Sequence, residues 1–280
     1  TRTVTITGMT NRSIRQHPKK AAVTTIDNET AEGRLREKGG KVTKELGVIG
    51  GLGPLATACF IETVVRMTDA RTDREHIPMI IYNKPGIPDR TSYILGKSSD
   101  NPYVQIAETG KALERQGVDY IAIPCVTAYF FYDQLCREIN VPIIDMIGET
   151  ARYLKERGIR RAGIMATDGT VTGGFLKKTL EESGLEVVHP SDEGQKLLMN
   201  IIYKGIKANM PFEMENFKAV KNELFRANAE VIVLGCTELS VIHRNYDIGP
   251  GFLDAMEVLA QKSVLLCGGR LKKEFVNLIT

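Results

Sequence analysis

From residue 46 onward, short apolar runs alternate with longer amphipathic stretches, and Gly or Pro marks most of the boundaries. Apolar residues recur at helical spacing in the longer stretches, as at Ala56, Phe60, Val64 and Met67. The short runs, many of them rich in Val and Ile, predict β-strands; they read ELGVIG, PMIIYN, DYIAIP, VPIID, RAGIMA, LEVV and EVIVLG. Strands and helices that alternate in this order predict an α/β fold with mainly parallel sheets and right-handed crossovers.

The pattern repeats once, weakly, along the chain. One half opens with LGVIGGLGPLAT and later reads DYIAIPCVTAYF, while the other opens with RAGIMATDGTVT and later reads EVIVLGCTELSV. In each half a strand enters a Gly/Thr loop, and roughly 75 residues later another strand ends close to a cysteine and a threonine. We therefore predict two related α/β domains, residues 46–147 with 250–280 and residues 148–249. The amphipathic stretch FLDAMEVLAQKSVLL is expected to return to the first.

The 280 residues are 42% hydrophobic and 25% charged, which is typical of a soluble globular protein. The apolar runs are too short to span a bilayer, and the first residues lack the apolar core of a secretory signal. Five cysteines form no close pair and four histidines are scattered, so neither a disulfide framework nor a metal site is expected. We predict a cytoplasmic protein with reduced thiols and no membrane partner.

Positive charge is concentrated in residues 1–45, which hold ten Lys and Arg against five Asp and Glu, leaving 27 against 29 for the rest of the chain. A basic arm of this kind could contact nucleic acid or anionic lipid. The acidic residues dilute its charge, however, and no aromatic residues are interleaved with it. We therefore favour a basic polar extension without a nucleic-acid partner.

Two of the five cysteines occupy equivalent places in the repeat. Cys125 and Cys236 each follow a predicted buried strand and precede a predicted helix, which Thr127 and Thr237 are able to cap. Ligands bind at the carboxyl ends of parallel strands, so both thiols are expected at the edge of one shared cleft. A helix N-terminus lowers the pKa of a thiol, and a thiolate facing a thiol across a substrate carbon can invert that carbon. The other cysteines are expected to be packing residues within helices: Cys59, Cys136 and Cys267.

The loop GVIGGLGPLAT raises a separate possibility, because Gly51, Gly53 and Ala56 fit the G-x-G-x-x-A spacing of dinucleotide-binding loops. Against that interpretation, the next predicted strand ends in Asn83, where a dinucleotide-binding protein has an Asp or Glu for the ribose. The spacing alone leaves the ligand of this loop open.

Five motifs, in this order and at these separations, resemble those of the cofactor-independent aspartate/glutamate racemases: GGLGPLAT, NKPGIPDRT, PCVTA, ATDGTVTGGFLKK and GCTEL. The resemblance covers about residues 46–270. It implies two pseudo-symmetric three-layer α/β units with the active site in the cleft between them, in a homodimer. It also implies that Cys125 and Cys236 invert the Cα of aspartate or glutamate without pyridoxal phosphate, another cofactor or a metal.

The same resemblance assigns roles to residues around the two thiols. Arg90 and Lys178 match basic residues of the family, and they are expected to bind the carboxylates of an acidic amino acid. Asp89 either orients Arg90 or caps a turn. Backbone N–H groups of the glycine loop are expected to bind a carboxylate rather than a pyrophosphate. The further positions expected at the substrate are Gly53, Asn83, Val126, Thr127, Thr167, Thr170 and Thr237.

Two positions depart from the family pattern. Val126 stands where the first-cysteine motif usually has Asn, and Tyr129 stands where it usually has His. The valine side chain cannot donate a hydrogen bond, so one contact to the substrate carboxylate is expected to be missing. The choice between aspartate, glutamate and another amino acid stays open. A related decarboxylase or cis–trans isomerase and a non-catalytic amino-acid-binding protein also stay open.

Overall fold

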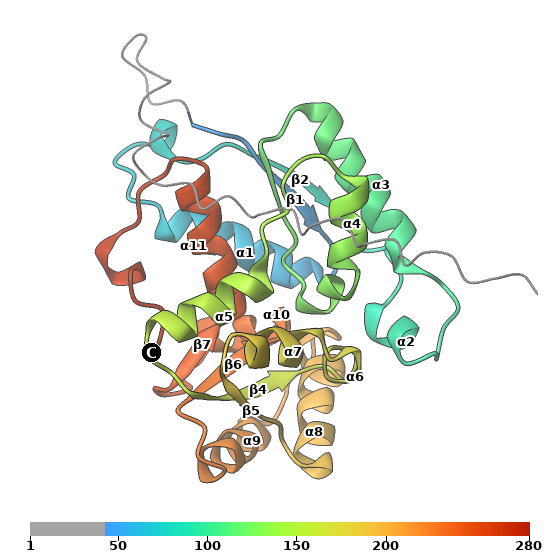
Figure 1. The fold of residues 1–280 in the computed structure, drawn as a ribbon, viewed down its shortest axis with the longest axis vertical. Helices are drawn as coiled ribbons and strands as arrows, with labels where there is room; N and C mark the ends of the chain where they lie inside the picture. Colours follow the sequence, from blue (N-terminus) through green and yellow to red (C-terminus); the bar gives the residue numbers. More distant parts are fainter. Residues whose placement is uncertain (1–42) are drawn as a thin grey trace, which may run out of the picture. The chain divides into compact units, whose positions relative to one another are not determined.

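The structure, a computed structural model, describes residues 43–280 (Figure 1). The predicted extension of residues 1–45 therefore lies almost wholly outside the described residues, and its limits and role stay predictions. Within the described range, no helix has both the length and the apolar character needed to cross a lipid bilayer.

The described chain contains two sheets in which all strand pairs are parallel. The first sheet has the order β2-β1-β3, from β1 (Leu46–Gly50), β2 (Met79–Asn83) and β3 (Tyr120–Ala122). The second has the order β5-β4-β6-β7, from β4 (Arg161–Ala166), β5 (Glu186–Val188), β6 (Val231–Gly235) and β7 (Phe252–Asp254). The matching strand orders confirm the predicted α/β class with two pseudo-symmetric units.

Helices follow most of the strands, as the alternating pattern predicts. The α-helices are α1 (Pro54–Met67), α2 (Arg90–Ile94), α3 (Pro102–Gln116), α4 (Tyr132–Glu138), α5 (Met146–Glu156), α6 (Asp168–Gly173), α7 (Phe175–Glu182), α8 (Asp192–Met199), α9 (Met214–Arg226), α10 (Thr237–Asn245) and α11 (Ala255–Leu266). The 3₁₀-helices are η1 (Asp73–Glu75), η2 (Val126–Phe131) and η4 (Lys273–Phe275), and η3 (Asn200–Ile206) is a π-helix.

One predicted strand is almost absent. The run VPIID contributes a single bridge, between Ile143 and Ile121, and the chain then turns into α5. The turn comes early because Asp145 caps α5, its side chain accepting a hydrogen bond from the Gly148 amide at 2.9 Å. Asp254 caps α11 in the same way at the equivalent place of the second sheet. The repeat therefore extends to the residue that ends each sheet.

The C-terminal stretch differs from its prediction in two respects. Its first three residues form β7, which pairs with β6, so they belong to the second sheet although residues 250–280 were assigned to the first domain. The helix that follows, α11, is buried on most sides rather than amphipathic. It packs against α1 and α5 (Figure 1), and its buried apolar residues belong to the larger hydrophobic core. The other domain limits stay predictions.

A polar cluster lies where α10 meets the start of α11. Asp254 accepts a hydrogen bond from the Ser240 hydroxyl at 2.8 Å, and its other oxygen lies 3.7 Å from Nδ1 of His243. Donor atoms of His243, Asp254 and Glu257 lie within 4.8 Å of one another. Burial raises the pKa of Glu257 to about 7; the negative charge of Asp254 adds to the rise and His243 opposes it. The cluster therefore contains a carboxyl group that resists ionisation.

Replacing this group should change the pH dependence of stability. The pKa of Glu257 is higher in the folded than in the unfolded chain. The folded state therefore loses stability as the pH rises from the unfolded-state pKa to the folded-state pKa. Glu257→Gln is expected to raise the free energy of unfolding by about 2 kcal/mol at pH 8 and much less at pH 5, measured by urea denaturation. Glu215→Gln, on an exposed side chain paired with Lys218, serves as the control. An equal gain for Glu257→Gln at both pH values would contradict the expectation.

Candidate active site

Cys125 and Cys236 lie in equivalent loops of the two sheets. Cys236 directly follows β6, and Cys125 follows β3 after Ile123 and Pro124. Both have extended backbone, with φ and ψ of −158° and 105° at Cys125 and −150° and 127° at Cys236, and each precedes a helical segment. Both side chains are buried, and neither takes part in a disulfide. The repeat predicted from sequence thus extends to the conformation of the two cysteines.

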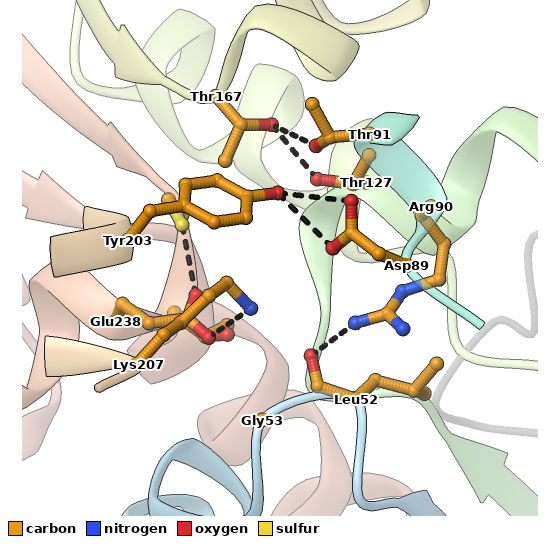
Figure 2. A network of polar contacts seen from close by, with 12 residues as sticks. Leu52, Gly53, Asp89, Arg90, Thr91, Thr127, Thr167, Tyr203, Lys207 and Glu238 are labelled. Atoms are coloured by element: carbon orange, nitrogen blue, oxygen red, sulfur yellow. Dashed lines mark hydrogen bonds and ion pairs between the residues drawn. The ribbon is translucent and has the colours of Figure 1, made fainter. Parts of the chain in front are cut away.

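Both cysteines line one small pocket of about 10 Å³, roughly the space of a single water molecule. The first half of the described chain contributes Asp89, Arg90, Thr91, Cys125, Val126 and Thr127 to its wall, and the second half contributes Thr167, Tyr203, Lys207, Cys236, Thr237 and Glu238. The pocket therefore lies between the two sheets, and Figure 2 shows the polar contacts among many of these residues. Asp89, Arg90, Lys207 and Glu238 also line a wider adjoining cavity that reaches Gly53 and Leu55.

Four threonine hydroxyl groups join the two halves on one side of the pocket. Thr167 lies 3.3 Å from Thr91, 3.1 Å from Thr127 and 3.2 Å from Thr170, measured between Oγ1 atoms, and Thr127 lies 3.0 Å from Thr170. The close approach of α6 to α2 needs Gly169, because a Cβ there would lie 2.7 Å from the Cα of Thr91. Hydroxyl groups can rotate to donate, so this cluster can turn hydrogen bonds toward a carboxylate.

The cations in the pocket wall, among the described residues, are Arg90 and Lys207. The Arg90 guanidinium is 5% exposed and donates to the carbonyl groups of Leu52 at 2.6 Å, Pro88 at 2.8 Å and Ile87 at 3.3 Å. Its Nε has no hydrogen-bond partner within residues 43–280. Burial lowers the pKa of Arg90, but the neighbouring Cys125 and Asp89 side chains raise it above its ordinary value. Arg90 is thus held charged; three of its five N–H groups donate to backbone carbonyls, which leaves two for a ligand.

Lys207 forms an ion pair with Glu238, whose carboxylate also accepts a hydrogen bond from Cys236. The Lys207 Nζ lies 2.7 Å from Oε1 of Glu238, and the Cys236 Sγ lies 2.9 Å from Oε2. Burial raises the pKa of Cys236 well above its ordinary value; Glu238 adds to the rise and Lys207 opposes it. The predicted stabilisation of a thiolate by the helix N-terminus is therefore outweighed at Cys236, which is a thiol donor in this arrangement.

The glycine loop supports the pocket wall. Gly51 has φ +90°, and a Cβ there would lie 2.3 Å from the Lys84 backbone; its amide donates to the Thr57 hydroxyl at 2.9 Å. At Gly53 a Cβ would lie 2.6 Å from Oε1 of Glu238. The Gly51 amide is therefore already bonded within the protein, and Gly53 leaves room for the Glu238 carboxylate. The binding of a carboxylate by other amides of the loop stays a prediction.

Two residues expected at the substrate lie elsewhere. The Lys178 side chain is 74% exposed, lies 3.9 Å from Glu182 and lines a different cavity. It faces away because Leu176 and Leu180 occupy the buried side of α7. Asn83 is exposed at the end of β2 and does not reach the pocket wall. In this structure both side chains lie outside the wall of the cysteine pocket, and a substrate-binding role for either stays a prediction.

The threonines next to the cysteines do not cap the following helices. Cys125 and Cys236 themselves occupy the cap positions, without side-chain capping bonds. The Thr127 hydroxyl belongs to the threonine cluster, and the Thr237 hydroxyl donates to the carbonyl of Pro124 at 3.2 Å. Both hydroxyl groups thus make contacts between the two halves. The capping prediction was wrong because these tertiary partners compete with the local amides.

The departures from the family pattern have distinct surroundings. Val126 is buried and lines the pocket beside Cys125, so it presents a methyl surface there. Tyr129 points away from the pocket, and its hydroxyl donates to the Ile144 carbonyl at 2.7 Å. Burial, followed by the charge of Asp145, raises the pKa of Tyr129 well above its ordinary value. The tyrosine therefore ties η2 to the start of α5.

Four residues of the wall were not predicted as site residues from the sequence: Thr91, Tyr203, Lys207 and Glu238. Glu238 had a signal, since it lies inside GCTEL two residues after Cys236. Tyr203 and Lys207 lie in and just after the π-helix η3, outside all five motifs. Their spacing of four residues is compatible with one helix face but marks no function by itself.

Comparison with known proteins shows the family to which the chain belongs. The chain is 33% identical to the aspartate racemase of Picrophilus torridus, with a TM-score of 0.73 over 83% of this chain and 98% of that one. An aspartate racemase homologue from Pyrococcus horikoshii OT3 is 28% identical, with a TM-score of 0.65 over 80% and 99%. RacX of Bacillus subtilis, a broad specificity amino-acid racemase, is 26% identical over 228 residues, which cover 78% of this chain and 96% of RacX. The Asp/Glu/Hydantoin racemase family matches residues 49–262, and the chain belongs to this family of amino-acid racemases.

Proposed function

We propose that this amino-acid racemase inverts the Cα of aspartate or glutamate by proton transfer between Cys125 and Cys236. The observation that carries the proposal is that two free cysteines, on equivalent loops of the two halves, line the same pocket. One sulfur removes the Cα proton as a thiolate while the other, a thiol, gives a proton to the opposite face. Each turnover exchanges the protonation states of the two sulfurs, so the reverse reaction uses the same groups.

The charges of the pocket favour a substrate with two carboxylates. The threonine cluster can donate to the α-carboxylate, while Arg90 and Lys207 can bind the side-chain carboxylate. The similarity to an aspartate racemase supports this substrate class, and the similarity to broad specificity RacX keeps a wider range within the proposal. The homodimer and the cytoplasmic location implied by the resemblance are also part of the proposal.

Glu238 has a place in this mechanism as the acceptor of the Cys236 proton. In the present arrangement the Lys207 ammonium pairs with the Glu238 carboxylate. A substrate carboxylate that draws Lys207 away leaves the Glu238 carboxylate unpaired, 2.9 Å from the Cys236 sulfur. Transfer of the thiol proton to Glu238 then produces the thiolate. Substrate binding and activation of Cys236 are coupled through one ammonium group.

Single replacement of either cysteine tests the two-thiol mechanism. Cys125→Ser and Cys236→Ser should each lower the rate of racemisation by at least about a thousandfold, because inversion needs an acid and a base on opposite faces. Each variant should still exchange the Cα proton of one enantiomer, since the remaining thiolate can remove and return a proton on its own face. Proton NMR in D₂O with each enantiomer of Asp and Glu measures both reactions.

The control variants for this experiment are Cys59→Ala and Cys136→Ala, whose thiols do not line the pocket. Their rates of racemisation should equal that of the parent once each rate is corrected for the fraction of folded enzyme. Full racemisation by either Ser variant would exclude the mechanism, and decarboxylated or isomerised products in the NMR spectrum would indicate a different reaction of the family fold.

A pair of lysine variants tests the charge recognition. Lys207→Ala should lower kcat/KM for aspartate and glutamate, because it removes a buried cation and leaves Glu238 unpaired. The loss should correspond to about 2–5 kcal/mol of transition-state stabilisation. Lys178→Ala should change kcat/KM by less than about twofold, since this side chain is exposed. The reverse order of effects would return the substrate-binding role to Lys178.

A further inference from the structure

One contact joins the two halves beside the cations of the pocket. The Tyr203 hydroxyl, on η3, donates to the Asp89 carboxylate, with oxygen–oxygen distances of 3.2 and 3.1 Å to its two oxygens. Figure 2 shows this contact between the arginine-bearing segment and the helix that carries Lys207. Burial raises the pKa of Tyr203, so its hydroxyl stays protonated and can donate. The contact is a hydrogen bond to a charged acceptor, which is among the stronger kinds in proteins.

Asp89 links this contact to Arg90. Its carboxylate caps α2, accepting from the Ser92 amide at 2.8 Å and from the Ser92 hydroxyl at 2.9 Å, and Arg90 is the first residue of that helix. The backbone turn that Asp89 fixes also supplies the carbonyl of Pro88, to which Arg90 donates. A shift of Asp89 would therefore move the guanidinium.

Tyr203 also contacts the second cation directly. The Lys207 Nζ lies 5.4 Å from the centre of the Tyr203 ring, within the range of a cation–π interaction. The residues are four apart, at the end of a π-helix, a form that is frequent at functional sites. One aromatic side chain thus touches Lys207 with its ring and holds the Arg90 segment through its hydroxyl.

We propose that Tyr203 is a positioning residue that sets the distance between Arg90 and Lys207 and so the fit of the substrate's side-chain carboxylate. The inference rests on the proposed function for the substrate, but it adds a residue that lies outside the five sequence motifs. Tyr203 takes no part in proton transfer at Cα, because its hydroxyl is bonded to Asp89.

This role predicts a specific kinetic signature. The charge of a side-chain carboxylate does not change while the Cα proton is transferred, so its contacts are equally strong in the ground state and the transition state. Loss of such uniform binding raises KM and leaves kcat unchanged. A role in stability alone would instead lower the fraction of active enzyme, which lowers kcat at constant KM.

Tyr203→Phe, which removes the hydroxyl and keeps the ring, tests the proposal. It should raise KM for the acidic substrate about 10-fold, with kcat within about twofold of the parent, as expected for one hydrogen bond to a carboxylate. Tyr132→Phe is the matched control, because this partly buried tyrosine also donates through its hydroxyl, to the Ile143 carbonyl, outside the cysteine pocket. It should keep the KM and kcat of the parent. An unchanged KM in Tyr203→Phe would overturn the proposal.

Asp89→Asn tests whether Tyr203 affects KM through Asp89, since an Asn side chain can still cap α2. If Tyr203 acts through Asp89, the double variant Asp89→Asn/Tyr203→Phe should raise KM no further than the more severe single variant. Increases in KM that multiply in the double variant would show that the two side chains act separately, which would overturn the proposed linkage.

Binding of succinate separates this inference from the proposed function, because succinate has two carboxylates and no Cα stereocentre. Calorimetry should give a dissociation constant about 10-fold higher for Tyr203→Phe than for the parent or Tyr132→Phe. If the parent racemises no amino acid but this difference appears, the positioning role holds and the proposed function fails. If racemisation occurs and the difference is absent from both KM and succinate binding, only the positioning role fails. A parent that neither racemises Asp and Glu nor binds succinate would overturn both.

Discussion

The ion pair between Glu238 and Lys207 is the interaction on which the rest of the pocket depends. A buried carboxylate without a cation is strongly destabilising, so the end of η3 must lie against the start of α10. The same carboxylate holds the Cys236 thiol and occupies the space that a side chain at Gly53 would fill. Three segments that are distant in the sequence are thus brought to one point by a single charge.

The pocket wall balances its charges before any substrate is present. Two cations face two carboxylates, and each has protein partners: Lys207 pairs with Glu238, Asp89 accepts from Tyr203, and Arg90 donates to backbone carbonyls. A substrate carboxylate that binds Lys207 must therefore replace an existing ion pair. Exchange of partners limits the net gain from each new ion pair, and it favours ligands that offer two carboxylates at the right spacing.

Sequence reasoning worked best where local pattern and repeat agree. The two cysteines could be paired because each follows an apolar run and precedes a helix, and the parallel pairing in both sheets follows from the same alternation. The sequence indicated that the threonines lie near the two cysteines, but it did not reveal which groups their hydroxyls contact. Their hydroxyl groups bond across the cleft, and such partners depend on how the two halves meet.

The misses have a common physical origin in tertiary contact. Lys178 shares a motif with the family, but a motif fixes position along the chain, whereas the packing of Leu176 and Leu180 decides which side of α7 faces solvent. β7 has three residues, too few for a pattern, and becomes a strand because β6 offers it an edge. The protonation of the Cys236 thiol depends on burial and on Glu238, neither of which the spacing of the loop reveals.

The burial of α11 has a consequence for how the cleft can move. On its side of the molecule the two halves share one continuous apolar core, which tolerates small sliding but resists separation because water would have to enter. On the threonine side the halves meet through hydroxyl groups, whose bonds water or a ligand can replace at little cost. The two edges of the cleft therefore differ in what their separation would require: the apolar edge would expose apolar surface to water, whereas the hydroxyl edge would exchange one set of hydrogen bonds for another.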